Sequence, residues 1–395
     1  MTLWKQFLRT AADRDVAGYF ERAPDDGGEV GVAVAFDRAE ELVTIDRKGG
    51  LADLGRATDR FLADPRSAVV GYVGFDAVGL FEPALDQNMD HSPFPLGELA
   101  FVRNARVGKV PRASPRSFSA GLVRRPTRDS LPAGPFGRSV RRLVEAIRAG
   151  EAFQVVLAHR RDWPRPSDLL ERADRLRATE RFAFFYYLKF GDREIVGASP
   201  ESVVEVRGEH AYVNPIAGTL PARSSGRSRL PLARDPKELA EHRMLVDLAR
   251  NDLGAVSRPG SVQLVWEERR QRFARLEHLV SRVHGRLRRE VGPWRALAAT
   301  FPAGTVSGAP KIRATELLRE EERTWRGPYA GTVAWLRPHR QADFALAIRS
   351  AFATGRRLYT AAGAGIVHRS DPEREFDETL SKLEHVEATL VGEPG

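Results

Sequence analysis

The chain has 395 residues, 42% of them hydrophobic and 29% charged, so it can bury one large core or the cores of two or three ordinary domains. It contains no cysteine, which excludes disulfides, thiolate metal sites and a cysteine nucleophile from this sequence. No apolar run approaches the roughly 20 residues of a membrane-spanning helix, and the first residues lack the apolar core of a signal peptide. We therefore expect a cytoplasmic protein that contacts no membrane.

The formal net charge of +9 raises the question of nucleic-acid binding, because clustered lysine and arginine bind phosphates. Most arginines here alternate with acidic residues, as in "LLERADRLRATERF" and "LLREEERTWRG". Such alternation is typical of a solvated helix face, and net charge reports on solubility more than on specific function. We expect no nucleic-acid partner.

Composition divides the chain into three parts. The segment 104–137 is rich in Pro, Gly, Ser and Arg and has little periodicity, which indicates a connecting loop between an N-terminal region, 1–103, and the remainder, 138–391. After this loop, apolar residues recur at the i, i+3, i+4, i+7 spacing of an amphipathic helix, and Gly150 follows as a natural end. The apolar positions of that helix are Val140, Leu143, Val144 and Ile147.

Most of the remaining chain alternates between β-rich runs and three further helices. Helices are predicted at 235–253, 310–323 and 373–391. The strands come in hairpin-like succession, which favours an α+β fold with large antiparallel sheets over a βαβ alternation. The strand-forming runs are "FQVVLAH", "FAFFYYLKF", "EIVGAS", "SVVEV", "AYVNPI", "YAGTVAWL", "FALAIRSAFA" and "RLYTAAGAGIV".

The helix at 235–253 carries a carboxylate in an unusual place. Asp235 suits the N-cap and Glu238 has the capping-box spacing. Helical geometry puts Glu241 beside Leu245 and Leu248, and a carboxylate on an apolar flank is unfavourable unless a cation meets it. Two interpretations stay open: a structural ion pair, or a metal or catalytic carboxylate.

The last helix has an apolar stripe from Phe376 to Leu390, with acidic and basic residues opposite. That opposite face carries Glu375, Glu378, Lys382 and His385. On spacing alone, Glu378 and Lys382 are best interpreted as a solvated i,i+4 pair that stabilises the helix by about 0.3 kcal/mol.

The stretch "FPAGTVSGAPKIRATELL", residues 301–318, places small residues and one lysine just before a helix. Gly304, Gly308 and Lys311 resemble a phosphate-binding loop, but the Walker motif requires Gly-Lys-[Ser/Thr] and this chain has Gly-Ala-Pro-Lys. Exposed backbone amides at a helix start led by Pro310 would still suit an anion. A second glycine-rich place is "TAAGAGIV".

Taken together, these segments resemble the chorismate-utilising enzymes. The likeness runs from about residue 138 to 391 and is carried by "AFQVVLAHR", "VGASPES", "NPIAGT", "AEHRMLVDLARNDLG", "FPAGTVSGAPKIRATELL", "GPYAGTVAW", "AIRSA", "AGAGIV" and "DETLSK". The resemblance implies a large two-domain antiparallel β-sandwich decorated by helices, a Mg²⁺ site between the sheets, and the dianion chorismate as substrate.

By this resemblance, Glu241 and Glu378 would hold Mg²⁺, with Glu238 and Glu375 close by. Magnesium prefers oxygen ligands and retains water, so two carboxylates and one from the substrate suffice. The substrate would be bound by residues in the matching segments, with an arginine fork on one carboxylate. These residues are Thr219, Tyr329, Arg349, Gly363 and Gly365.

The resemblance also implies four catalytic residues. Glu201, in "ASPES", would be the general acid that protonates the departing C4 hydroxyl, and burial should raise its pKa. His278, expected in a helix, would assist the loss of pyruvate, although a buried histidine in a helix is often only packed. Thr305 would lie in the pocket wall, and Lys382 would add positive charge.

Members of the family differ in what attacks the ring. Where isochorismate and salicylate synthases have a lysine base this chain has Gln154, and where aminodeoxychorismate synthases commonly have a lysine it has Ala217. Ammonia at C2 is then the favoured nucleophile, as in the large subunits of anthranilate synthases. Without cysteine the chain needs a separate glutaminase (glutamine amidotransferase) subunit. Aminodeoxychorismate synthase and aminodeoxyisochorismate synthase remain as alternatives.

The sequence departs from the family pattern in two places. The tryptophan-binding signature Leu-Leu-Glu-Ser is missing, "GYFERAPDD" stands in its place, and we expect weak or no inhibition by tryptophan. In "NPIAGTLPAR", Asn214 and Leu220 occupy positions where the family usually has charged residues, which leaves open whether the reaction stops at the aminated intermediate.

Overall fold

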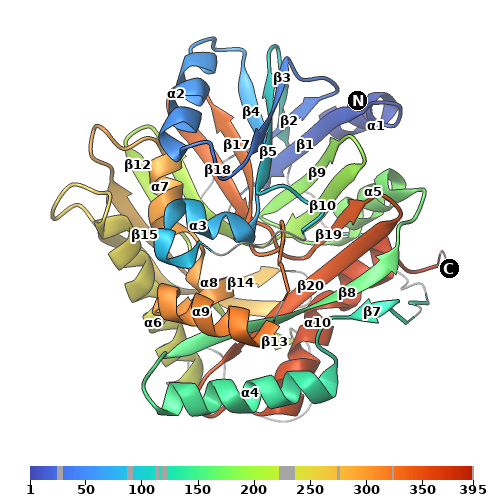
Figure 1. Cartoon of the computed structure of the whole chain (residues 1–395). Coiled ribbons are helices and arrows are strands. Elements are labelled where there is room, and N and C mark those ends of the chain that lie inside the picture. The colour runs from blue at the N-terminus through green and yellow to red at the C-terminus, as the bar shows by residue number, and fades with distance from the viewer. Residues whose placement is uncertain are drawn as a thin grey trace.

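The computed structural model contains two large sheets, with helices around them (Figure 1). It describes the chain except residues 25–29, 87–91, 112–114, 117–121, 124, 222–235, 274–275, 323 and 394–395. It describes no side chains for 217–221, 236–238, 268, 270–273 and 276–278. Within the described chain, every strand pairing of the two sheets is antiparallel, which confirms the predicted α+β class.

Each sheet combines strands from both ends of the sequence. In the described residues the first sheet has ten strands: β16 Gly308–Ala309, β8 Gln154–Pro164, β20 Arg357–Ile366, β19 Ser350–Thr354, β10 Arg193–Ser199, β9 Phe184–Phe190, β1 Val16–Arg22, β2 Gly31–Phe36 and β6 Arg106–Val110 in this order, with β7 Arg128–Asp129 on β8. The second, also of ten, has β13 Ile216–Pro221, β15 Leu276–Arg286, β12 His210–Val213, β11 Ser202–Arg207, β18 Gln341–Leu346, β17 Thr332–Arg337, β4 Ala68–Val73, β5 Gly97–Val102 and β3 Glu41–Ile45, with β14 Gln263–Phe273 on β15.

The helices pack around these sheets. They are α1 Leu3–Ala11, α2 Leu51–Phe61, α3 Val78–Phe81, α4 Ala133–Arg148, α5 Leu169–Thr179, α6 Pro236–Gly254, α7 Pro293–Thr300, α8 Gly304–Ser307, α9 Lys311–Glu322 and α10 Pro372–Leu390, with 3-10 turns at Phe75–Ala77 and Pro83–Leu85. The predicted helices at 138–150, 235–253, 310–323 and 373–391 correspond to α4, α6, α9 and α10. In the described part of the chain, no helix is both long and apolar enough to cross a membrane.

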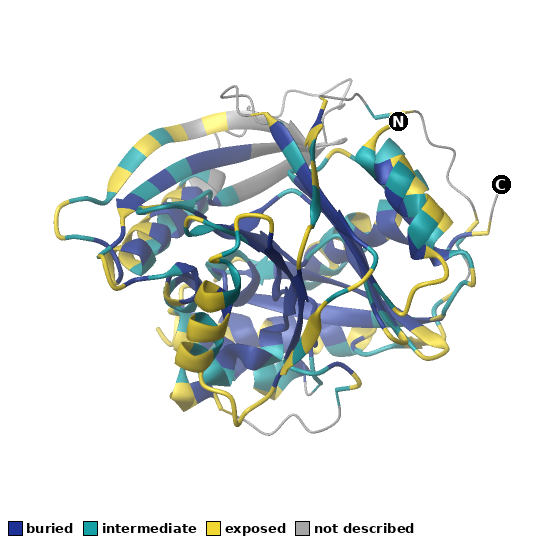
Figure 2. Cartoon of the chain, turned by 90° about the horizontal axis from the view of Figure 1, so that it is seen from above, coloured by how far each residue is buried: buried dark blue, intermediate teal, exposed yellow. Residues whose placement is uncertain are grey.

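The first sheet is covered by helices on one of its faces and by the second sheet on its other face. Strand β9 shows how its residues allow this. Successive strand residues point to opposite faces. Phe184 and Tyr186 join the large core between the sheets, whereas Phe185 and Tyr187 join a second core that includes apolar residues of α1, α5 and α10. Both faces of β9 are therefore buried, as Figure 2 shows for the centre of the molecule.

The segment predicted as a connecting loop, 104–137, is only partly a loop. Arg106–Val110 forms β6, the edge strand next to β2, and α4 begins at Ala133. Composition concealed this strand because it is short and three of its five residues are Arg106, Gly108 and Lys109. Since the first 103 residues supply strands to both sheets, they are part of the sandwich itself.

One β-rich run that looked continuous is divided between the two sheets. "FALAIRSAFA" forms β18 in the second sheet and β19 in the first. The preceding pair β10 and β11 makes the same change of sheet. These two crossovers place the candidate site.

Candidate active site

The candidate site lies where the chain twice passes between the sheets. Glu201 lies between β10 and β11, and Arg349 lies between β18 and β19. The Leu346 amide donates to the carbonyl oxygen of Glu201 at 2.9 Å, and the Ala198 amide donates to that of Arg349 at 3.2 Å. The two crossovers are therefore bonded side by side, and they bring together residues almost 150 positions apart in the sequence.

Glu201 is a buried carboxyl group whose nearest hydrogen-bond donor is neutral. Its residue is 7% exposed, and Thr305 Oγ1 donates to its Oε1 at 2.7 Å. Burial raises the pKa of Glu201 to about 8, against the smaller opposing effects of the Thr305 hydrogen bond and the Lys382 charge. At neutral pH this carboxyl group holds a proton that it can donate.

Arg349 has a left-handed backbone conformation, φ 53°, which is uncommon for a residue with a side chain. Its Nη1 donates to the Lys382 carbonyl oxygen at 2.6 Å. Burial lowers its pKa, and the nearby acidic residues and Tyr329 oppose this shift. An arginine nevertheless stays cationic, so Arg349 can meet an anion.

Tyr329 is 4% exposed and lies near Arg349. Burial raises the pKa of Tyr329 to about 12, so its hydroxyl remains a hydrogen-bond donor. A guanidinium and a phenol in one buried place suit a carboxylate.

The Glu378–Lys382 pair forms, but it lies against a strand. Lys382 Nζ is 2.6 Å from Glu378 Oε1 and donates to the Gly363 carbonyl oxygen in β20 at 2.8 Å. The Glu378 side chain is 42% exposed, so its carboxylate keeps access to solvent. The solvated-pair interpretation missed the contact with β20, because spacing along one helix does not show what faces it.

Glu241 reaches the same strand from α6. Gln154 Nε2 donates to Glu241 Oε1 at 2.5 Å. A Cβ atom at Gly365 would lie 2.5 Å from that amide nitrogen and 3.4 Å from Glu241 Oε1, so a larger residue would displace the Gln154 side chain. Glu241 and Glu378 thus approach residues 363–365 of β20 from two different helices.

These two carboxylates fit a magnesium ion in their chemistry. Both offer hard oxygen donors, and the glycine at 365 keeps the space beside Glu241 free of a side chain. No group of three or more His, Asp or Glu with metal-binding geometry occurs among the described residues. The protein would supply two ligands and leave the other positions to water or substrate.

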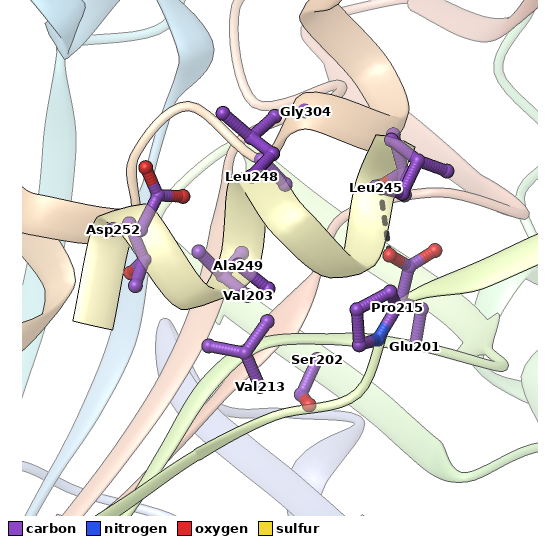
Figure 3. A pocket seen from close by; sticks show the side chains of 13 residues that line it. Glu201, Ser202, Val203, Val213, Pro215, Leu245, Leu248, Ala249, Asp252 and Gly304 are labelled. Carbon is purple, nitrogen blue, oxygen red and sulfur yellow. Dashed lines mark hydrogen bonds between the residues drawn. The ribbon is translucent and has the colours of Figure 1, made fainter. Parts of the chain in front are cut away.

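A small cavity of about 30 Å³ adjoins Glu201 (Figure 3). Glu201 lies at one end and Asp252 at the other, with Leu248, Ala249 and Val203 between them. A Cβ at Gly304 would lie 2.2 Å from Leu248 Cδ2, so glycine lets this loop pack directly on α6. Ala303, Gly304 and Thr305 of the 301–311 loop line this cavity.

Some predicted residues fall outside the described side chains. Thr219 and Leu220 lie in β13 and His278 in β15, but only their backbone is described. The same holds for Glu238 in α6, and Asp235 lies outside the described residues.

Two contacts were not predicted from the sequence. One is the hydrogen bond from Gln154 to Glu241. The other joins Lys311 Nζ to Asp252 Oδ2 at 2.6 Å. Asp252 lies on the same helical stripe as Glu241, Leu245 and Leu248, and this periodicity was the available signal.

At the place of the missing tryptophan signature, residues 18–22 form part of β1. Glu21 is 2% exposed and accepts hydrogen bonds from the Tyr19 hydroxyl at 2.7 Å and Arg177 Nε at 2.8 Å. Its carboxylate is thus engaged within the protein.

Comparison with known proteins agrees with this geometry. Residues 26–388 match the model of the chorismate binding enzyme family. The chain is 37% identical to "Anthranilate synthase component 1 2" of Haloarcula marismortui over 93% of this chain and 70% of that protein. It is 46% identical to "Anthranilate synthase component 1" of Methanothermobacter thermautotrophicus, over 60% of this chain and about half, 52%, of that protein's length.

Solved structures show the same architecture. Anthranilate synthase component I from Streptococcus pneumoniae superposes with a TM-score of 0.74 and 31% identity, covering 93% of this chain and 90% of that chain. A putative isochorismate synthase from Bacillus anthracis has a TM-score of 0.75 at 19% identity, which shows the shared fold alone. The family match over nearly the whole chain, together with these relatives, shows that this protein belongs to the chorismate-binding enzymes.

Proposed function

We propose that this protein is the large component of an anthranilate synthase, which converts chorismate and ammonia to anthranilate, pyruvate and water. The observation that carries the proposal is Glu201, a buried acid with a pKa of about 8 that accepts a hydrogen bond from Thr305 and lies near the Lys382 charge. The names and coverage of the relatives support the same reaction.

Chorismate has two carboxylates, a ring hydroxyl and an enolpyruvyl ether. Arg349 and Tyr329 would bind one carboxylate, since one brings a positive charge and the other a hydroxyl donor. Ammonia would form a bond to C2 while the C4–oxygen bond breaks. Glu201 would give its proton to the departing hydroxyl, which leaves as water.

In the second stage the C2 proton is removed and the bond from C3 to the enolpyruvyl oxygen breaks, which releases pyruvate and makes the ring aromatic. His278 is the proposed base or proton carrier for this stage. Its strand, β15, runs beside β13, where the proposed substrate residue Thr219 lies.

Glu241 and Glu378 would hold Mg²⁺. When bound, the ion would offset the negative charge of the second substrate carboxylate. Gln154 would keep Glu241 oriented toward residue 365, and Lys382 would hold Glu378 near residue 363.

Ammonia must be supplied to this site. A glutaminase of the usual type uses a cysteine nucleophile, and this sequence has none. We therefore propose a separate glutaminase subunit as partner. Release of glutamate from glutamine by the purified chain alone would contradict this part.

The test is a product assay with purified chain, chorismate, Mg²⁺ and ammonium at alkaline pH, followed by fluorescence and chromatography. Anthranilate would support the proposal. The product 4-amino-4-deoxychorismate would assign the chain to the aminodeoxychorismate synthases. A non-aromatic C2 amine would show that the reaction stops after the first stage.

A further inference from the structure

Lys311, the lysine of the small-residue stretch, makes a largely buried charged contact that the proposed reaction does not use. It is the first residue of α9, and its Nζ donates to Asp252 Oδ2 in α6 at 2.6 Å and to the Thr300 carbonyl oxygen of α7 at 2.9 Å. The two side chains are only 14% and 13% exposed. One ammonium group therefore ties three helices together.

On α6, Asp252 shares a face with the proposed metal carboxylate. Glu241, Leu245, Leu248 and Asp252 follow the i, i+4, i+7, i+11 spacing, which keeps side chains on one stripe. Over this span α6 extends by about 16 Å. A contact that fixes the rotation of the helix at Asp252 therefore also fixes the direction of Glu241.

On the loop, Lys311 closes the segment that carries Thr305. The bond to the Thr300 carbonyl oxygen joins the two ends of this segment. Between them, Gly304 packs on Leu248, and Thr305 donates to Glu201 at 2.7 Å. The position of the Thr305 hydroxyl therefore depends on how the loop seats on α6.

We propose that Lys311 and Asp252 are positioning residues that seat the 300–311 loop on α6, and so hold Thr305 against Glu201 and Glu241 beside residue 365. This inference rests on the function proposed above. It also explains why the stretch combines small residues with one lysine. The small residues allow the loop to pack closely on α6, and the lysine fixes the position of the loop along that helix.

A buried ion pair is better suited to fixing the position of the loop on α6 than to stabilising the fold. Removing charges from water offsets most of their attraction, so an apolar pair of similar size is often as stable. Burial lowers the pKa of Lys311 and raises that of Asp252, and each residue opposes the shift of the other. What the ion pair adds over apolar packing is direction, because its hydrogen bonds require one arrangement.

The test compares Lys311→Met, Asp252→Leu and the double variant with the wild-type chain. Each single variant leaves one charge without its partner, and its melting temperature should fall. The double variant should regain most of that loss. If the pair positions the loop, kcat of the double variant should nevertheless fall by about 10-fold or more, as a small misplacement of catalytic groups does.

Two readouts separate positioning from a structural role. The pH profile should move, because Thr305 lowers the pKa of Glu201. With that hydrogen bond weakened, and Lys382 still present, the basic limb of kcat should shift to higher pH. Calorimetric titration with Mg²⁺ should also show weaker binding than to the wild-type chain, since Glu241 is no longer held in one direction.

The matched control is the Glu21–Arg177 pair, 3% and 23% exposed, which lies on β1 and α5. Glu21→Gln with Arg177→Met should change stability and leave kcat, its basic limb and Mg²⁺ binding unaltered. An inactive wild-type chain would overturn the proposed function. An active wild type with a double variant of unchanged kcat, pH limb and Mg²⁺ binding would overturn this inference alone, as would a double variant that fails to fold.

Discussion

Two buried glutamates in different regions of the sandwich have opposite surroundings. Glu98, in β5, is 0% exposed and accepts hydrogen bonds from the Tyr72 hydroxyl at 2.9 Å and from Arg193 at 2.8 and 2.6 Å. Glu201, at the crossover, is 7% exposed and accepts one from the neutral Thr305 hydroxyl. The same residue type therefore serves two different purposes.

Glu98 joins the two sheets, because Arg193 belongs to β10 of the other sheet. The two hydrogen bonds from one guanidinium hold the Glu98 side chain in place and stabilise the fold. Among the described side chains no cation contacts Glu201 directly, so burial favours its protonated form. The difference teaches that burial beside a neutral donor keeps a proton on a carboxyl group that a direct arginine partner would hold as an ion.

The largest expected effect is that of Glu201→Gln. Loss of the proposed general acid should lower kcat by about 10²–10⁴-fold. Because the native pKa of about 8 exceeds the ordinary 4.5, the native state binds more protons than the unfolded state between these values, and wild-type stability falls as pH rises through that range. Glutamine does not titrate, so the variant does not lose stability in this way. The free energy of unfolding of the variant minus that of the wild type, measured by urea unfolding, should therefore increase from pH 4.5 to 8. A constant difference would show that Glu201 is ionised in the native protein.

The substitution Glu378→Gln should have the next largest effect. Removing one of the two carboxylates proposed to hold Mg²⁺ should lower kcat/KM by about 10²-fold and weaken Mg²⁺ binding in calorimetry. Asp377→Asn, an exposed neighbour on the same helix, is the matched control and should have little effect. Equal effects of the two variants would argue against a specific metal site.

Glu98→Gln should show the reverse pattern. Arg193 would lose its charged partner, and because its side chain is 28% exposed, water would partly replace the contact. We expect the free energy of unfolding to fall by about 2 kcal/mol, with kcat unchanged once the protein is folded. A large loss of kcat in folded protein would make Glu98 part of the site.

Thr305→Val tests the one hydrogen bond that distinguishes the site glutamate. Loss of the hydroxyl should raise the pKa of Glu201 above about 8 and shift the basic limb of kcat upward. The expected fall in kcat is about 10-fold, which corresponds to about 1.4 kcal/mol, an ordinary value for one hydrogen bond. A downward shift of the limb would mean that Thr305 does not stabilise the carboxylate.

The smallest expected effect concerns tryptophan. Glu21, at the place of the missing signature, resembles Glu98 in that a tyrosine and an arginine already bind its carboxylate. Micromolar tryptophan should therefore leave the initial rate unchanged, measured under subsaturating chorismate. Clear inhibition in this range would show that the region remains open to an effector.

Much of the fold could be predicted because its signals are local. The stripe of α6, the glycine after α4 and the strand-forming aromatic run of β9 are features of one segment each. Strand β6 was missed because its pairing with β2 is a tertiary contact. The division between β18 and β19 was missed because an apolar run looks the same whether it stays in one sheet or crosses to another.

The sequence by itself determined the residue inventory: the carboxylates at 201, 241 and 378, the arginine at 349, the absent cysteines and the order of segments typical of the family. Only the tertiary structure decided how those residues act. Backbone hydrogen bonds between the two crossovers bring Glu201 beside Arg349, and burial raises the pKa of Glu201. Helices α6 and α10 both place side chains against strand β20. The physical reason is that burial and electrostatic environment depend on neighbours distant in sequence, which no spacing along the chain records.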